Sequence, residues 1–267
     1  MTVPTSPSPA ATALATRHRL GGLKYTFRPE SELGVQGKYR IWFIVGSLVG
    51  IAALLGGGVL LWVNVHWGVA IFPLWIGVVA AGVASQSPLY RRGLAARRLH
   101  LHEHGLVVNT SGRRLFAVRW EQAVLYQQTV QEVIDYKGTQ TPVGRTHNSQ
   151  LVAPGGQKAQ ITDVYADSPT WAPLIAEAVA RAQVDKVWKL VGEGKTVAFG
   201  PYKISGAGVT NAAGEVLPWR DVNEVAVRGG IVCVWRTGRT KAWAASQAHK
   251  VPNLLVFLTI VDNLHRQ

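Results

Sequence analysis

The sequence of 267 residues has one cysteine, Cys233, and few acidic residues. A single thiol can form neither an intramolecular disulfide nor a cysteine-based zinc site, so disulfide scaffolds and zinc fingers are excluded. Only 15 Asp and Glu stand against 28 Lys and Arg, which gives a formal net charge of +13. Such a basic excess is compatible with nucleic acid, with an anionic membrane surface or with no ligand at all, and the positions of the charges have to distinguish these alternatives.

Charged residues are missing altogether from Ile41 to Tyr90, a run of 50 residues without Asp, Glu, Lys or Arg. One helix of that length would rise roughly 75 Å, whereas the hydrocarbon core of a bilayer is about 30 Å thick. Two passes over 41–63 and 66–84 fit, with a turn at the polar residues Asn64 and His66. The sequence therefore predicts a transmembrane helical hairpin within residues 41–90.

Basic residues flank this hairpin on both sides, and the turn between the two spans has no formal charge. Those before it are Arg17, Arg19, Lys24, Arg28, Lys38 and Arg40, and those after it are Arg91, Arg92, Arg97 and Arg98. By the positive-inside rule both flanks stay in the cytoplasm, so we expect a multi-pass protein of the cell membrane with both termini cytoplasmic. We expect residues 1–40 to form a partly disordered cytosolic tail; a transit peptide is the alternative for its first 20 residues.

After Arg98 the sequence consists of short apolar runs separated by turn signals, a pattern typical of antiparallel strands. We expect the first module over 98–192, with a closing helix of about 20 residues that begins at Ser168-Pro169 and ends before Gly192 and Gly194. Its first strand cannot be located, and we expect a long loop from Tyr136 to Ser149. The predicted strands are 99–102, 106–109, 115–119, 123–133, 151–153 and 159–162.

A second module over 195–265 repeats this plan and ends in a helix over 252–264. Its predicted strands are 196–199, 202–205, 208–211, 215–217, 222–228, 231–235 and 241–244. Two motifs recur between the modules: Gly105-Leu106-Val107 matches Gly208-Val209-Thr210, and Trp120-x-x-Ala123-x-x-Tyr126 matches Trp219-x-x-Val222-x-x-Val225. The sequence therefore contains an internal repeat.

These strand and turn motifs resemble bacterial pleckstrin-homology-like (PH-like) domains. A transmembrane hairpin followed by two such modules resembles a family of uncharacterised bacterial membrane proteins, over roughly residues 20 to 265. The resemblance implies an α+β fold, in which the N-terminal two-helix hairpin is followed by two mostly-β modules, each closed by a C-terminal helix. It implies no activity and no catalytic residue.

The histidines His100, His102 and His104 alternate, so on one strand they would share a face and could hold a metal ion. The alternative is that Leu99 and Leu101 point to the core while His100 and His102 face solvent. The sequence contains no nucleophilic triad, phosphate-binding glycine loop or helical metal motif at a usable spacing. We therefore expect no enzyme activity and no cofactor, and His100 and His102 stay as the metal candidates.

Four arginines lie within eight residues after the hairpin: Arg91, Arg92, Arg97 and Arg98. Anionic headgroups concentrate at the cytoplasmic surface, so we expect these side chains to contact lipid; the alternative is that they only set the topology. The preferred function is a membrane-anchored, non-enzymatic binding or scaffold protein that presents two PH-like modules to an anionic lipid or a protein partner. The alternative is a subunit of a membrane transport or enzyme complex, and transport would require an oligomer. A nucleic-acid partner is disfavoured because no basic recognition helix is found.

Overall fold

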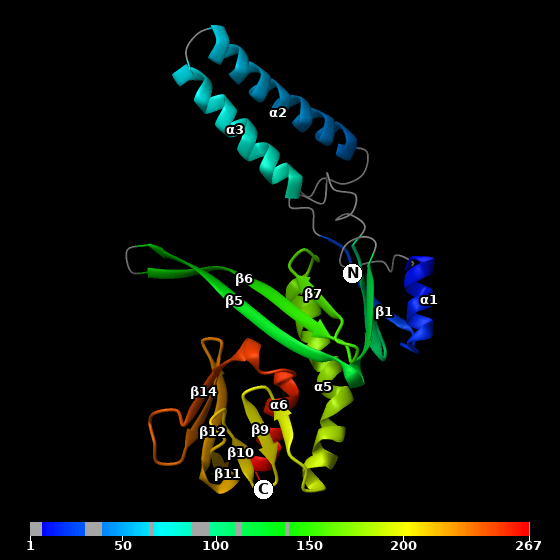
Figure 1. Ribbon diagram of the computed structural model, residues 1–267, viewed down its shortest axis with the longest axis vertical. Helices are drawn as coiled ribbons and strands as arrows, with labels where there is room; N and C mark the ends of the chain where they lie inside the picture. The colour runs from blue at the N-terminus through cyan, green and yellow to red at the C-terminus, as the bar shows by residue number, and fades with distance from the viewer. Residues whose placement is uncertain are drawn as a thin grey trace. The chain divides into compact units, whose positions relative to one another are not determined.

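The computed structural model describes residues 7–29, 39–64, 67–86, 97–109, 114–136 and 139–266 (Figure 1). The chain divides into two compact units. The hairpin unit comprises residues 28–98 and 111–114, and the β-rich unit comprises residues 1–27, 99–110 and 115–267. The β-rich unit is therefore assembled from segments on both sides of the hairpin in the sequence.

The hairpin unit contains two apolar helices, α2 (Tyr39–Asn64) and α3 (Trp67–Gln86). Their segments Ile44–Val63 and Gly68–Ser85 have mean hydropathies of 2.3 and 2.0, and only 6% and 11% of these windows are buried. Both helices have the length, composition and exposure expected of a membrane hairpin. The predicted helices 41–63 and 66–84 are thus confirmed as helices, whereas His66 of the predicted turn lies outside the described residues.

The first sheet of the β-rich unit is antiparallel, with the order β1-β2-β3-β4. Its strands are β1 (Leu23–Phe27), β2 (Leu99–His102), β3 (Gly105–Asn109) and β4 (Leu115–Arg119). The strand β1 pairs with β2, so that Phe27 lies opposite Leu99 although residues 28–98 separate them in the chain. The strand that the sequence leaves unlocated is therefore β1, on the other side of the hairpin.

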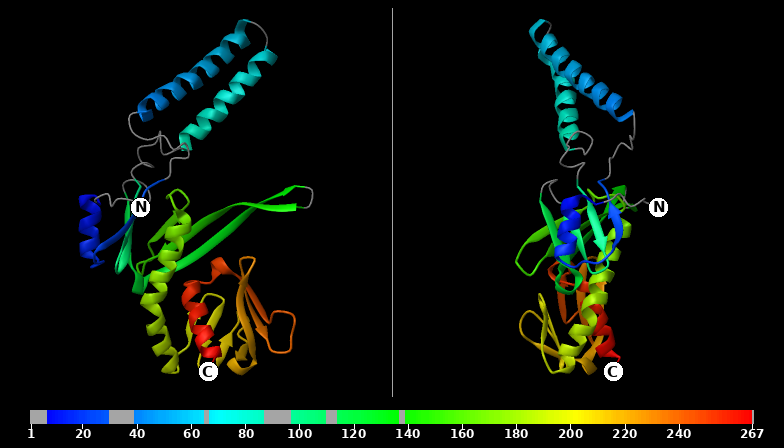
Figure 2. Two further views of the ribbon diagram at one scale, coloured as in Figure 1. Left: turned by 180° about the vertical axis from the view of Figure 1, so that it is seen from behind. Right: turned by 90° about the vertical axis from the view of Figure 1, so that its right-hand side faces the viewer.

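The N-terminal segment is also structured before β1. Residues Pro9–Arg17 form the helix α1, which Ser8 caps by accepting a hydrogen bond from the Ala11 amide at 3.2 Å. Residues Ala11 and Ala15 of α1 pack with Val107 and Ala117 of the sheet, so α1 covers the face of β1–β4 opposite the main core (Figure 2). Residues 9–27 of the expected partly disordered tail are ordered, because this segment forms α1 and β1 and buries apolar side chains against the sheet.

The second sheet has the order β5-β6-β7 and is followed by the helix α5. A short 3₁₀ turn, η1 (Trp120–Gln122), leads into it, and the other elements are β5 (Val124–Tyr136), β6 (Thr139–Val152), β7 (Lys158–Thr162) and α5 (Ser168–Gly192). The prediction of a loop over 136–149 is wrong. Most of this range belongs to β6, which pairs with β5 in a long β-hairpin (Figure 1). Few residues from 139 to 148 are apolar, so hydrophobic alternation gives no strand signal there.

The second module repeats the arrangement of four strands, three strands and a helix, in two antiparallel sheets of order β11-β10-β9-β8 and β12-β13-β14. Its elements are β8 (Val197–Phe199), β9 (Tyr202–Ser205), β10 (Gly208–Thr210), β11 (Val216–Pro218), η2 (Trp219–Asp221), β12 (Val222–Arg228), β13 (Ile231–Arg236), β14 (Ala244–Gln247), η3 (Ala248–Lys250) and α6 (Leu254–His265). The last strand lies at 244–247 rather than at the predicted 241–244.

The motifs that recur in the sequence occupy equivalent places in the two modules. The indole Nε1 of Trp120 donates to the carbonyl of His102 at the end of β2, at 3.2 Å. In the second module, the indole Nε1 of Trp219 donates to the carbonyl of Ser205 at the end of β9, at 2.9 Å. A Cβ atom on Gly105 would collide with the carbonyl oxygen of Val118, and one on Gly208 with that of Leu217. Each module therefore requires glycine at the start of its third strand.

The two modules share one hydrophobic core, which includes Leu101 and Trp120 of the first and Phe257 of the second. The helix α5 contacts elements of both modules, including η1, β8 and α6. The side chain of Asn253, at the start of α6, accepts from the Leu125 amide at 2.7 Å and donates to Gln183 Oε1 of α5 at 2.8 Å. The β-rich unit is consequently a single folded body.

Candidate functional site

Arginines gather at the end of the first sheet where the chain leaves for the hairpin. Arg28 directly follows β1, and Arg98 directly precedes β2. The adjacent residues Phe27 of β1 and Leu99 of β2 are paired. Arg114 directly precedes β4 at the same end. Neighbouring strands lie about 4.8 Å apart, so these three backbone positions fall within roughly 15 Å of one another. We call Arg28, Arg98 and Arg114 the arginine cluster.

The members of the cluster differ in exposure: Arg28 and Arg114 are exposed, and Arg98 is half-buried. Burial lowers the pKa of Arg98, and the positive charge of Arg28 lowers it further. An arginine with such a lowered pKa is still protonated at physiological pH. The two neighbouring guanidinium groups of Arg28 and Arg98 therefore raise the local positive potential.

The predicted arginine site is only partly described by the structure. Arg91 and Arg92 lie outside the described residues, whereas Arg97 and Arg98 are both half-buried. Arg98 Nη1 donates to the carbonyl of Arg97 at 2.6 Å, and the Nε of Arg97 is buried without a hydrogen-bond partner in the described part of the chain. Sequence proximity could not include Arg28, which the strand pairing brings beside Arg98, or Arg114, which lies two strands away from Arg98 at the same end of the sheet.

The histidines have protein partners. His100 and His102 are buried, so the expectation that they face solvent is wrong, because the N-terminal segment covers this face of β2. His100 Nδ1 lies 3.0 Å from Thr26 Oγ1, and His102 Nδ1 lies 3.2 Å from the carbonyl oxygen of Gly21. Among the residues that the structure describes, no group of three His, Cys, Asp or Glu side chains could hold a metal ion. These histidines instead attach β2 to the N-terminal segment.

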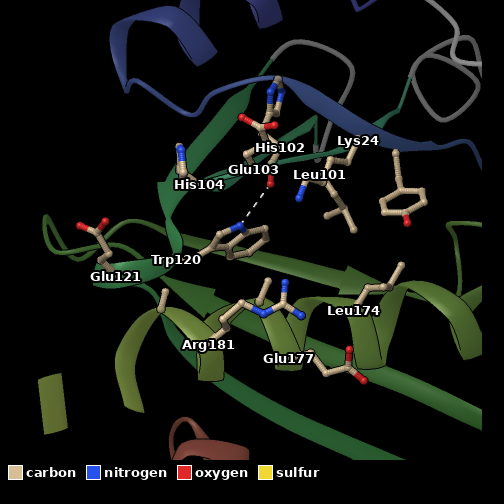
Figure 3. A pocket seen from close by; sticks show the side chains of 13 residues that line it. Lys24, Leu101, His102, Glu103, His104, Trp120, Glu121, Leu174, Glu177 and Arg181 are labelled. Atoms are coloured by element: carbon tan, nitrogen blue, oxygen red, sulfur yellow. Dashed lines mark hydrogen bonds between the residues drawn. The ribbon is translucent and has the colours of Figure 1, made fainter. Parts of the chain in front are cut away.

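A cleft of about 690 Å³ lies between the β1–β2 pair and α5 (Figure 3). Leu101 and Trp120 form its apolar floor, with Leu174 and Ala178 of α5 beside them. Lys24 and Arg181 line the cleft from opposite sides. The cleft therefore combines an apolar floor with two cationic side chains from distant parts of the sequence, a composition suited to ligand binding.

These features define a class of protein in which an apolar helical hairpin interrupts the first of two β-rich modules. The chain belongs to a family of unknown function, DUF6585, whose model matches residues 5–267. The match covers α1, β1, the hairpin and both modules, so the interrupted arrangement lies within the family's boundaries. No curated protein and no solved structure matches the chain.

Proposed function

We propose that this protein is a membrane-anchored, non-enzymatic binding protein that holds two PH-like modules at the cytoplasmic surface of the cell membrane, with the arginine cluster in contact with anionic lipid. The observation that carries the proposal is the position of Arg28, Arg98 and Arg114 at the end of the sheet that continues into the hairpin. Arg28 and Arg98 lie on the segments that lead into and out of the hairpin, and basic residues close in sequence to a membrane span attract anionic headgroups.

The strand pairing supports a topology with both flanks on one side. Residues 23–27 and 99–102 belong to one sheet, so they must lie in the same compartment. Two membrane crossings between them satisfy this requirement, and a single crossing does not. The basic residues on both flanks favour the cytoplasm as that compartment.

The succession of strands supports the PH-like assignment. Each module consists of a four-stranded antiparallel sheet, a three-stranded antiparallel sheet and one closing helix. Each module is thus mostly β and closed by a C-terminal helix, as the sequence resemblance implies. In the first module the hairpin takes the place of the connection between the first two strands.

The proposal is tested on the full chain in detergent, with native mass spectrometry of bound phosphatidylglycerol and phosphatidylcholine. An arginine near an anionic surface contributes about 1 kcal/mol, so Arg28→Gln, Arg98→Gln and Arg114→Gln together should weaken phosphatidylglycerol binding about 100-fold. The matched control changes Arg220, Arg228 and Arg239 of the second module to Gln and should retain binding. Equal affinity of the wild type for both lipids, or unchanged binding by the triple variant, would contradict the proposal.

A further inference from the structure

We propose that the cleft between β1 and α5 binds an extended peptide segment of a partner protein that carries a carboxylate side chain. The cleft is distinct from the arginine cluster, because its cations are Lys24, near the start of β1, and Arg181, on α5. The inference goes beyond contact with lipid and assigns a protein-binding role to the same module.

A β-bulge directs side chains of β1 into the cleft. Leu23 pairs with His102 and Tyr25 pairs with Leu101, so Lys24 is the extra residue between two registered pairs. Such a bulge places consecutive side chains on one side of a sheet and commonly re-aims them beside a binding site. Lys24 and Tyr25 accordingly both line the cleft, where the Tyr25 side chain is 47% exposed.

The lysine and the arginine of the cleft are Lys24 and Arg181. No ion pair of Lys24 or Arg181 occurs in the described part of the chain. Figure 3 shows their side chains approaching the space beside Trp120 from opposite sides. A carboxylate between them would be attracted by both charges over an apolar floor that excludes water.

The acids of the cleft have other partners or point away from Lys24 and Arg181. Glu103 Oε2 accepts from the Gly22 amide at 3.1 Å, and Glu121 pairs with Arg119 at 3.1 Å. Glu177 is the remaining acid, and Figure 3 shows its carboxylate directed away from Lys24 and Arg181. Lys24 and Arg181 are therefore the charged groups whose side chains approach the space beside Trp120, and this position favours a carboxylate ligand there.

The walls of the cleft favour an extended peptide. One wall is β1, whose outer edge pairs with no strand among the described residues. Residues Tyr25 to Phe27 pair regularly with β2, so this part of β1 has the normal pleat of a strand. The other wall is the stretch of α5 from Leu174 to Ala182, which rises roughly 12 Å and matches three to four residues of extended chain. Backbone pairing to an edge strand, with side chains in an adjoining groove, is an established mode of peptide recognition.

The test uses the full chain in neutral phosphatidylcholine nanodiscs, which remove any contribution of anionic lipid. A phage-displayed library of random octapeptides is selected on the wild type and counter-selected on empty nanodiscs. The expected result is enrichment of peptides with an Asp or Glu beside apolar residues. A synthetic peptide of the enriched sequence should bind about tenfold more weakly to each of Lys24→Glu and Arg181→Glu.

The matched control is Lys186→Glu, which reverses an exposed charge on α5 outside the cleft and should leave peptide affinity unchanged. Replacing the peptide's acid with Lys should weaken binding to the wild type and restore it to Arg181→Glu. The proposal is overturned if no acidic peptide is enriched, if Lys24→Glu and Arg181→Glu bind as the wild type does, or if free glutamate competes as well as the peptide does.

Discussion

Trp120 and Trp219 occupy equivalent positions but differ in burial. Trp120 is 3% exposed, whereas Trp219 is only partly buried at the edge of the same core. Trp120→Ala should therefore lower the free energy of unfolding by about 3 to 5 kcal/mol, and Trp219→Ala should lower it by less. Urea unfolding of the full chain in detergent, followed by circular dichroism, measures both values. An equal loss of unfolding free energy in the two variants would contradict the expectation that the more buried indole contributes more to stability.

Tyr202 provides a prediction at high pH. Its side chain is buried and its hydroxyl donates to the carbonyl of Val232 at 2.9 Å. Burial raises the pKa of Tyr202 to about 12, and the nearby Cys233 adds to the rise. An unfolded tyrosine has a pKa near 10, so the folded state holds this proton more tightly. The resulting stability is fully present below about pH 10 and is lost as the pH rises through the folded value.

The measurement compares the wild type with Tyr202→Phe from pH 9 to 12. At neutral pH the variant should lose about 1 kcal/mol, because the hydrogen bond to Val232 is removed. Between about pH 10 and 12 the free energy of unfolding of the wild type should fall more steeply than that of Tyr202→Phe. Parallel curves for the two proteins would mean that Tyr202 does not carry the raised pKa.

At the scale of elements, the start of α6 joins the two modules. Asn253 has a φ of 49°, in the left-handed region, and its backbone amide donates to the carbonyl of Leu125 at 2.7 Å. Its side chain bonds the Leu125 amide and Gln183, and Gln183 Nε2 in turn donates to the carbonyl of Trp120 at 2.6 Å. These bonds link β5, α5 and α6.

Substitutions at Asn253 separate the hydrogen bonds from the backbone conformation. Asn253→Gly keeps the left-handed conformation and loses the side-chain bonds, which should lower the free energy of unfolding by about 2 kcal/mol. Asn253→Ala also disfavours that conformation and should lower it by about 1 kcal/mol more. Equilibrium unfolding in urea is the readout. Wild-type stability of both variants would contradict these roles of Asn253.

Elements with apolar periodicity could be predicted from the sequence, and elements held by distant pairing could not. The strand β2 and the helix α5 bury regular apolar positions such as Leu99, Leu101 and Ile175, so their bounds follow closely from the pattern. The strand β1 could not be predicted because its partner lies beyond the hairpin, and the outer part of β6 could not because few of its residues are apolar. Only part of the arginine cluster could be predicted, for the same reason. Arg98 lies close to the hairpin in sequence, whereas strand pairing brings Arg28 and Arg114 to the same end of the sheet as Arg98.

At the scale of the whole molecule, the pairing of β1 with β2 predicts which surfaces are accessible from outside the cell. In a Cys233→Ser background, Asn64→Cys at the end of α2 should react with an impermeant thiol reagent on intact cells. Ala213→Cys, in an exposed turn of the second module, should react only after lysis. Labelling of Ala213→Cys on intact cells would reverse the proposed topology.

The central claim is that one sheet is assembled across the hairpin, and removing the hairpin tests it most directly. Arg28 and Arg98 adjoin the paired residues Phe27 and Leu99, so the chain ends on either side of the hairpin are close together. A short Gly-Ser linker from residue 29 to residue 97 can therefore replace the intervening chain. The comparison is with the fragment 97–266, which lacks α1 and β1.

The linked protein should be soluble, rich in β-structure and cooperative in urea unfolding. The fragment should be less stable by at least about 3 kcal/mol, because it loses the buried Phe27 and uncovers His100 and His102. Equal stability of the two proteins would contradict the claim.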